Sequence, residues 1–392
     1  MRKNRSRTEG LRNVIALGFV SFFTDVSTEM VLGILPIFVL RELGATRAIL
    51  GLIEGLAEAT SHIFRMLSGV ISDKLGRRKL LVFVGYAFSS VVKPFFSIAT
   101  SWIDVLVIRF GDRVGKGVRT SPRDALLSES APERHMGKAF GLHRTLDQLG
   151  AIVGPALAFV LIPLIGMRSI FWISFIPGFV ALIILLFFVK EKVSKHREVK
   201  LSGNVKNVLR KDFVLLLLIV TIFSLGAFNF SFILLKAGQL GMPEAFIPIV
   251  YAVINITHTG IGIPAGALSD KVGEERVLLM GYVAFFFTSL LCMALGGSPS
   301  YALLIAAVYG VYFGIVETVQ RALIPKYSSS ELRATAYGVY YLVVGASFLV
   351  ANIVVGTLWE YVGIQAAFSY SLIMSMTAVI GMATFVKLSR RV

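Results

Sequence analysis

The sequence predicts an all-α polytopic membrane protein with twelve transmembrane helices, arranged as two pseudo-symmetric bundles of six. Three observations carry this prediction: an apolar composition, a succession of apolar runs of spanning length, and an internal repeat. Of the 392 residues, 56% are hydrophobic and only 16% are charged, and the mean hydropathy is +0.77. Soluble domains carry about a quarter of their residues as charges, so this chain belongs in a bilayer.

Apolar runs of about 20 residues, the length that crosses ~30 Å of hydrocarbon at 1.5 Å per residue, follow one another along the chain. They begin near Val14, Leu50, Leu80, Ile103, Gly137, Ser169, Phe213, Ala245, Val277, Tyr301, Thr335 and Ile364. The first run lacks a small-residue cleavage site, so we expect a retained helix and not a signal peptide. The single cysteine, Cys292, argues against a disulfide framework or a thiolate metal cluster. No metal or cofactor is expected, and an ion gradient would supply the energy.

The formal net charge of +16 would suggest a nucleic-acid partner in a soluble domain, so the location of the basic residues decides its meaning. Of the 39 Lys and Arg residues, 26 fall at the termini and in even-numbered loops, nine within spans and four in odd-numbered loops. By the positive-inside rule, both termini are expected in the cytoplasm. The basic excess therefore reflects topology in the cell membrane. The expected partners are the lipid bilayer, a small-molecule substrate and a coupling ion, with no nucleic acid, and we expect a monomer.

An internal repeat relates the two halves of the chain. The segment GVISDKLG begins at residue 69 and GALSDKVG begins at residue 266, an offset of 266 − 69 = 197 residues. The segments KAFG at 138 and TAYG at 335 share this offset, as does the pair Ala-Leu at 125 and 322. Three anchors in one register indicate a duplication. We predict an N-terminal bundle over 1–190, a basic cytoplasmic linker over 191–212 and a C-terminal bundle over 213–392.

The loop after the second span matches the signature G-x-x-x-D-[RK]-x-G-R-[RK] and thereby resembles prokaryotic members of the major facilitator superfamily. The matching residues are Gly69, Asp73, Lys74, Gly76, Arg77 and Arg78. The resemblance implies this family's fold and an alternating-access transporter. We interpret the loop charges, with Asp124 as a further partner, as a conformational latch. They could instead only anchor the loop, and the second copy has Glu274 and Glu275 where the arginines would stand, which leaves a symmetric role open.

The fifth span carries a pattern similar to G-x8-G-x3-G-P-x2-G-G, which is typical of the proton-antiporter, drug-efflux-like branch of that family. The match consists of Gly141, Gly150, Gly154 and Pro155, whereas the final glycine pair is absent. Gly150 and Gly154 form a G-x-x-x-G face that allows close helix approach, and Pro155 permits a bend. The resemblance implies a hinge and export by exchange, and ordinary small-residue packing is the alternative.

The fourth span carries a stripe of basic residues on one helical face. It comprises Arg109, Arg113, Lys116, Arg119 and Arg123, spaced four, three, three and four apart. Each would cost about 2.5–3.5 kcal/mol if it faced lipid at mid-membrane. The stripe must therefore face protein or water, and the alternative for Arg119 and Arg123 is a place at the cytoplasmic end of the span. We assign Arg109, Arg113, Lys116 and Arg119 to a substrate cavity. The resemblance implies one arginine active in proton exchange, for which Arg113 fits best and Arg109 is the rival.

Carboxylates on the first two spans could pair with this stripe and carry protons. The candidates are Asp25, Glu29, Glu54 and Glu58. An arginine that approaches or leaves a buried carboxylate changes its proton affinity, which is the basis of an antiport mechanism. The alternative is a set of fixed ion pairs. Further cavity candidates are His62, His143, Arg144, Asp147, Asn229, Glu317 and Arg321.

We predict a secondary active transporter, in the first place a proton-coupled antiporter that exports a small organic compound, with an anion as one option for the substrate. The alternative is a uniporter or symporter of an anionic metabolite. A membrane-embedded enzyme or sensor is a third and weaker hypothesis. The run from Gly111 to Gly117 is one residue too short for a phosphate loop and lacks its Ser or Thr, and neither H-E-x-x-H nor G-x-S-x-G occurs.

Overall fold

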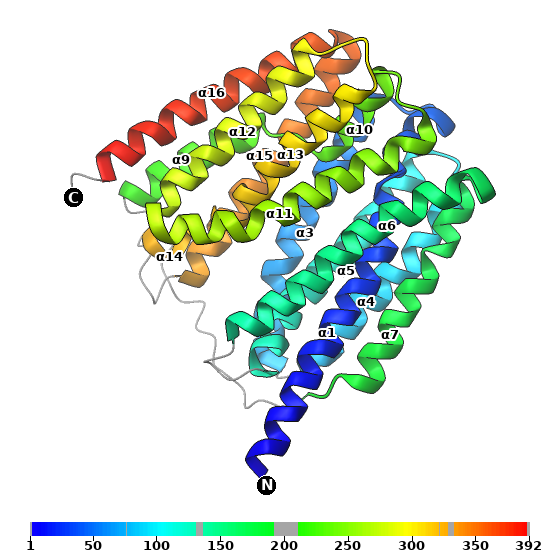
Figure 1. Ribbon diagram of the computed structural model, residues 1–392, viewed down its shortest axis with the longest axis vertical. Coiled ribbons are helices and arrows are strands. Elements are labelled where there is room, and N and C mark those ends of the chain that lie inside the picture. The colour runs from blue at the N-terminus through cyan, green and yellow to red at the C-terminus, as the bar shows by residue number, and fades with distance from the viewer. Residues whose placement is uncertain are drawn as a thin grey trace. The chain divides into compact units, whose positions relative to one another are not determined.

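The computed structural model describes residues 2–75, 77–130, 136–191, 211–320, 322–327 and 333–389 (Figure 1). Side chains are not described at 2–9, 70, 73, 136–138, 325, 333–335 and 389. The regular elements of this part of the chain are helices. The predicted all-α membrane fold is confirmed.

Contacts divide the chain into two compact units: unit 1 comprises Met1–Phe38 and Thr60–Val199, and unit 2 comprises Val39–Ala59 and Lys200–Val392. The helices that lie wholly in unit 1 are α1 (Arg2–Leu32), α2 (Leu35–Ile37), α4 (Arg78–Val92), η2 (Lys93–Ile98), α5 (Trp102–Ser130), α6 (Met136–Ile173) and α7 (Phe175–Phe188). Those that lie wholly in unit 2 are α9 (Lys211–Gly226), α10 (Phe230–Gln239), η4 (Glu244–Phe246), α11 (Ile247–Val272), α12 (Glu274–Ala294), α13 (Ser300–Val319), α14 (Ile324–Tyr327), α15 (Arg333–Tyr361) and α16 (Ile364–Ser389). Helix α3 (Arg47–Leu75) and the short η1 (Phe38–Glu42) are divided between the units.

Nine segments of the described chain are long and apolar enough to cross a membrane. One of them, Ala139–Phe188, has 50 residues, which as one straight helix would be about 75 Å long, more than two bilayer cores of ~30 Å. It turns at Gly166, where a φ of 74° interrupts α6, so it holds two of the predicted spans. Helices α3 and α5 have 29 residues each and are long enough to span a bilayer. They are not among the nine apolar segments because they carry more charged residues. With these additions the segments account for the twelve predicted spans.

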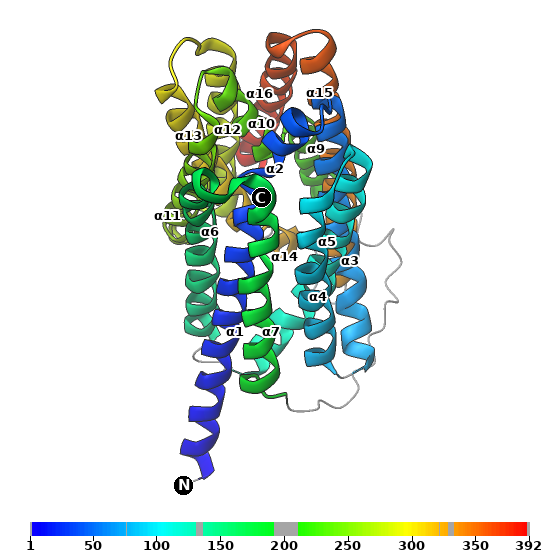
Figure 2. The same ribbon diagram turned by 90° about the vertical axis from the view of Figure 1, so that its right-hand side faces the viewer.

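In unit 1, α1 packs against α6 and α7, and α4 packs against α5 (Figures 1 and 2). Glycines make the closest of these approaches. A Cβ atom on Gly150 would lie 2.3 Å from the carbonyl oxygen of Phe22, and one on Gly154 would lie 2.8 Å from that of Val26. The small residues of the predicted G-x-x-x-G face thus lie where α6 meets α1. The backbone break in α6 is at Gly166 and not at Pro155.

Helices α4 and α5 cross at a second pair of glycines. A Cβ atom on Gly115 would lie 2.7 Å from the carbonyl oxygen of Gly85 and 2.9 Å from the backbone nitrogen of Ser89. Backbone atoms cannot move aside as a flexible side chain can, so this crossing requires glycine at position 115.

We expect Gly115→Ala to lower the free energy of unfolding by about 1–3 kcal/mol, the usual cost of overpacking. The matched control is Gly111→Ala on the same helix, where the nearest atoms would lie 3.6 Å from the new Cβ, an ordinary contact. Both changes gain the same helix propensity of about 1 kcal/mol, so their difference isolates the clash. Thermal unfolding in detergent measures it, and equal midpoints for the two variants would contradict the prediction.

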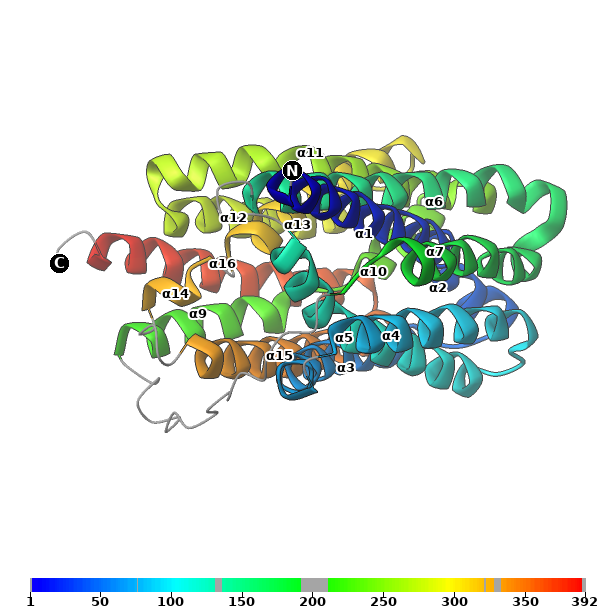
Figure 3. The same ribbon diagram turned by 90° about the horizontal axis from the view of Figure 1, so that it is seen from below.

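In unit 2, α11 packs against α13, and α12 packs against α13 and α16 (Figure 3). A stacked pair of rings, Phe223 on Tyr282 with centroids 3.8 Å apart, forms part of its core. The first half of α3 packs in this unit against α15. A Cβ atom on Gly51 would lie 2.1 Å from the carbonyl oxygen of Asn352, and Arg47 forms an ion pair with Glu360 at 2.9 Å.

Candidate functional site

The basic stripe of α5 faces the interior of unit 1. Arg109 and Arg113 are each 1% exposed and Arg119 is 4% exposed, while Lys116 and Arg123 are half-buried. The guanidinium group of Arg119 lies over the ring of Tyr86, 4.4 Å from its centroid, a cation–π contact that stabilises a buried charge. Three of the five cations of the stripe are thus buried inside the protein.

Asp112 neutralises part of this stripe. One carboxylate oxygen lies 3.3 Å from Nη1 of Arg109, and the other accepts a hydrogen bond of 2.5 Å from the hydroxyl of Ser89 on α4. Sequence reasoning missed Asp112, although its position three residues after Arg109 places it on the same face of the helix.

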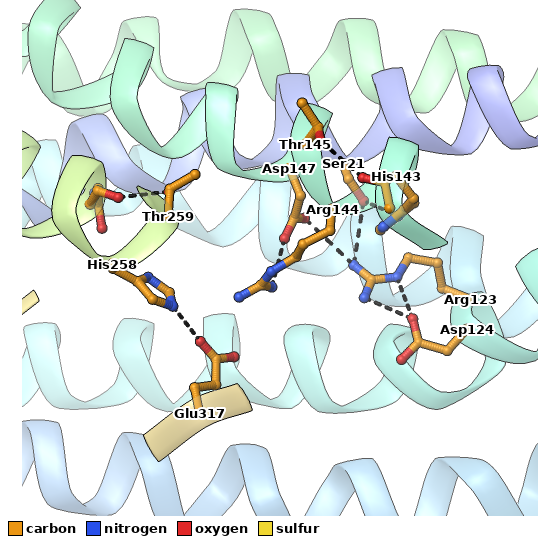
Figure 4. Close-up of polar contacts among 12 residues, drawn as sticks. Ser21, Arg123, Asp124, His143, Arg144, Thr145, Asp147, His258, Thr259 and Glu317 are labelled. Carbon is orange, nitrogen blue, oxygen red and sulfur yellow. Dashed lines mark hydrogen bonds and ion pairs between the residues drawn. The ribbon is translucent and has the colours of Figure 1, made fainter. Parts of the chain in front are cut away.

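Ser21 on α1 joins three other helices in a buried polar network, and Figure 4 shows its contacts with α5 and α6. Its hydroxyl lies 2.9 Å from Nε2 of His143 on α6 and 3.3 Å from the hydroxyl of Tyr86 on α4. It also accepts a hydrogen bond of 3.3 Å from Nη1 of Arg123 on α5. Arg123 in turn pairs with Asp124 at 2.8 Å. Neither Ser21 nor Tyr86 was predicted from the sequence. His143 was assigned to the cavity and Asp124 to the latch, and Arg123 was named only as part of the basic stripe.

Asp147 on α6 connects this network to the predicted proton carriers. It lies 3.1 Å from Arg144 and 3.9 Å from Arg123, and its carboxyl group lies against that of Asp25 on α1. Asp25 and Glu29 are half-buried on the face of α1 that meets Gly150 and Gly154. The structure therefore brings together residues that the sequence assigned separately to proton coupling and to the cavity.

A buried lysine that sequence reasoning passed over lies at the end of α4. Lys93 is 1% exposed, and its ammonium group donates hydrogen bonds to the hydroxyls of Ser27 at 2.6 Å and Thr28 at 3.1 Å, both on α1. A single cation inside an apolar run gives no periodic signal, which is why the sequence did not reveal it.

The other predicted carriers and cavity residues are distributed between the units. Glu54, which is fully buried, and Glu58 belong to the first half of α3 and so to unit 2. His62 is half-buried on the second half of α3, in unit 1.

Three predicted cavity residues lie in the C-terminal part of the chain. Asn229 caps α10 by accepting a hydrogen bond from the backbone N–H of Ser231 at 2.9 Å. Glu317 on α13 pairs with His258 on α11 at 2.8 Å (Figure 4), a partner that the sequence did not identify. Arg321 lies outside the described residues.

The predicted latch is described only in part, because Gly76 and the side chain of Asp73 lie outside the described residues. Gly69 lies near Ser121 on α5, and Lys74 and Arg77 are exposed. Arg78 forms an ion pair of 2.6 Å with Glu129 at the end of α5. Asp124 pairs with Arg123, as described above.

The same contact recurs in unit 2 with the charges exchanged. Adding the repeat offset of 197 to Arg78 and Glu129 gives positions 275 and 326, which are Glu275 and Lys326. These two form an ion pair of 2.8 Å. Burial alone would lower the pKa of Lys326, but its hydrogen bonds to Glu275 and Glu274 outweigh burial and hold the pKa above its ordinary value. The duplication has therefore kept the position of the ion pair and inverted its polarity.

The remaining glycine of the antiporter-like pattern, Gly141, has open space where a Cβ atom would be. Within the part of the chain that the structure describes, no three His, Cys, Asp or Glu side chains gather as a metal site would require. The chain thus combines membrane-spanning helices with a buried network of charges linking α1, α4, α5 and α6. This is the architecture of a polytopic membrane transporter.

Comparison with known proteins identifies the family. The family model of the Major Facilitator Superfamily matches residues 17–317 and 214–392, and the chain belongs to this family. It is 38% identical to an uncharacterized MFS-type transporter of Methanocaldococcus jannaschii over 368 residues, covering 92% of this chain and 91% of the relative. It is 26% identical to the multi-drug resistance efflux pump PmrA of Streptococcus pneumoniae over 322 residues, 79% of each chain. A crystal structure of a mutant of the nucleoside transporter NupG shares the fold, with a TM-score of 0.80, 14% identity, and coverage of 95% and 99% of the two chains.

Proposed function

We propose that this MFS transporter is a proton-coupled antiporter that exports a small organic compound across the cell membrane by alternating access, as a monomer with both termini in the cytoplasm. The observation that supports it best is the contact between the carboxyl groups of Asp25 and Asp147 inside unit 1. The concentration of Lys and Arg at the termini and in alternate loops supports the orientation.

The chemistry of this contact suits proton exchange. Two carboxylates that touch repel each other when both are ionised, and a hydrogen bond between them requires a proton on one. Arg123 and Arg144 lie on the Asp147 side of the pair, at 3.9 Å and 3.1 Å. A movement of either arginine relative to Asp147 would change how much negative charge the pair can hold. The pair could thereby take up a proton in one conformation and release it in the other.

The export direction is supported by similarity. A relative that shares 26% identity over 79% of this chain is named as a multi-drug resistance efflux pump. The close packing of Gly150 and Gly154 against α1, on the same face as Asp25, would let a change in α6 reach the carboxyl pair directly.

Transport of an anionic metabolite is the second candidate, favoured by the buried charges of unit 1. Among its described residues four cations are buried, namely Lys93, Arg109, Arg113 and Arg119, against the two carboxylates Asp112 and Asp147. A buried excess of positive charge is costly and would be relieved by a negatively charged substrate.

The test uses purified protein in liposomes that enclose a pH-sensitive dye, with an imposed pH gradient and three probes: ethidium, chloramphenicol and benzoate. For a probe that drives proton movement through the wild-type protein, we expect the proton flux to fall at least tenfold in Asp25→Asn and in Asp147→Asn. The matched control is Asp104→Asn, at the half-buried start of α5, which should retain the flux.

The outcomes separate the candidates. Probe movement without proton flux in the wild-type protein would refute proton coupling. Movement of benzoate alone, lost in Arg113→Ala and Arg119→Ala, would replace the first candidate by the second.

A further inference from the structure

A groove on unit 1 lies between α1 and α7, away from the buried charge network. It has a volume of about 380 Å³. Its walls are apolar and include Ile15, Phe19, Ile184 and Phe187. The proposed transport function does not use this groove.

Two cations lie at one end of the groove. Arg12 on α1 and Lys190, just after α7, both line it and are both exposed. The groove therefore combines a long apolar wall with a doubly charged mouth, which is the arrangement that an amphipathic anion requires.

The charged mouth is held in place by hydrogen bonds. The side chain of Asn13 donates to the carbonyl oxygen of Lys190 at 2.6 Å and accepts from its backbone N–H at 2.8 Å. Asn13 also donates to the hydroxyl of Ser130 at the end of α5, at 3.2 Å. These bonds fix the backbone of Lys190 beside α1, so Arg12 and Lys190 remain on the same groove.

We infer that this groove binds one phospholipid with an anionic headgroup, its phosphate between Arg12 and Lys190 and an acyl chain along Phe19 and Ile184. Basic pockets between transmembrane helices near the membrane surface are suited to anionic headgroups. An apolar wall alone would accept any lipid, and two cations alone would accept any phosphate. The combination selects an anionic lipid.

The test compares phosphatidylglycerol, phosphatidylcholine and soluble glycerol phosphate, each added to the purified full-length protein in detergent. Two quantities are measured: the thermal unfolding midpoint and the lipid that remains bound in native mass spectrometry. We expect phosphatidylglycerol to raise the midpoint by several degrees more than phosphatidylcholine does, and to remain bound as one molecule per chain. Glycerol phosphate should have no effect.

Variants assign the effect to the groove. Arg12→Gln combined with Lys190→Gln leaves the backbone bonds to Asn13 intact and should remove at least half of the difference between the two lipids. Arg276→Gln combined with Lys387→Gln removes two cations from unit 2 and should leave that difference unchanged. Ile184→Ala keeps both cations but shortens the wall, so it should reduce retention of the lipid.

Each opposite result overturns the inference. An equal effect of glycerol phosphate would show that a phosphate ion is sufficient. An equal effect of phosphatidylcholine, or the same loss in both double variants, would show that the lipid is not selected by Arg12 and Lys190. If the first double variant unfolds too early for its midpoint to be compared, native mass spectrometry decides, because undiminished retention of phosphatidylglycerol would also refute the site.

Discussion

Replacement of Asp112 by alanine is expected to destabilise the protein by about 3–5 kcal/mol, the usual cost of removing one partner from a buried ion pair. Arg109 and Asp112 are both buried and lie 3.3 Å apart, so alanine at position 112 would remove a carboxylate that neutralises the buried charge of Arg109. Ser89 would also lose the acceptor of its hydrogen bond. Chemical or thermal unfolding in detergent measures the loss.

Two comparisons show whether the loss comes from the buried pair. Asp104→Ala removes a half-buried carboxylate that accepts backbone hydrogen bonds at the start of the same helix, and should cost only about 1 kcal/mol. The double variant Arg109→Met with Asp112→Leu removes both charges, and buried pairs replaced in this way often recover stability. If the double variant were as unstable as the sum of its single variants, the two residues would not act as a pair.

Reversal of one charge in the inverted ion pair of unit 2 is expected to destabilise the protein by about 1–3 kcal/mol, and reversal of both is expected to restore it. Glu275 is buried and binds Lys326 at 2.8 Å and the hydroxyl of Tyr327 at 2.5 Å. Glu275→Arg therefore places a cation beside Lys326 and removes an acceptor, which carries the cost of a lost buried hydrogen bond. Lys326→Glu should cost less, because Lys326 is 47% exposed and water screens it.

The double variant Glu275→Arg with Lys326→Glu gives unit 2 the polarity that unit 1 has at Arg78 and Glu129. We expect this double variant to reverse at least half of the decrease in the thermal unfolding midpoint that Glu275→Arg causes alone. Lys387→Glu, a reversal at an exposed cation on α16, is the control and should change little. A double variant less stable than either single one would mean that the two units hold their ion pairs in unlike surroundings.

The fold could be predicted from the sequence because its signals are long and repeated. Apolar runs of spanning length and a register of 197 residues shared by three anchors leave few alternatives. The burial of Arg109 and Arg113 could also be predicted, because five cations at helical spacing cannot face lipid. A regular sequence pattern can be interpreted without a structure when the alternative placement of its residues would carry a large energetic cost.

The polar network itself could not be predicted in the same way. Ser21 and Tyr86 are isolated hydroxyls in apolar helices, and nothing in their spacing distinguishes a hydrogen-bonding role from packing. The ion pair of His258 and Glu317 joins residues on different helices, so its partners depend on how α11 packs against α13. Glu275 was visible in the sequence as a departure from the loop signature. That it forms an ion pair with Lys326, with the charges exchanged relative to unit 1, could be seen only from the contact in the structure.

The division of α3 has a consequence for producing parts of this protein. Residues 39–59 complete the packing of unit 2, where Gly51 meets Asn352 and Arg47 pairs with Glu360. A polypeptide of residues 213–392 alone would present that side of α15 without the glycine-lined helix that covers it. We therefore expect residues 213–392 to fold only when residues 39–59 are co-expressed as a second polypeptide. Recovery of folded protein only on co-expression would show that residues 39–59 are a structural part of the C-terminal bundle.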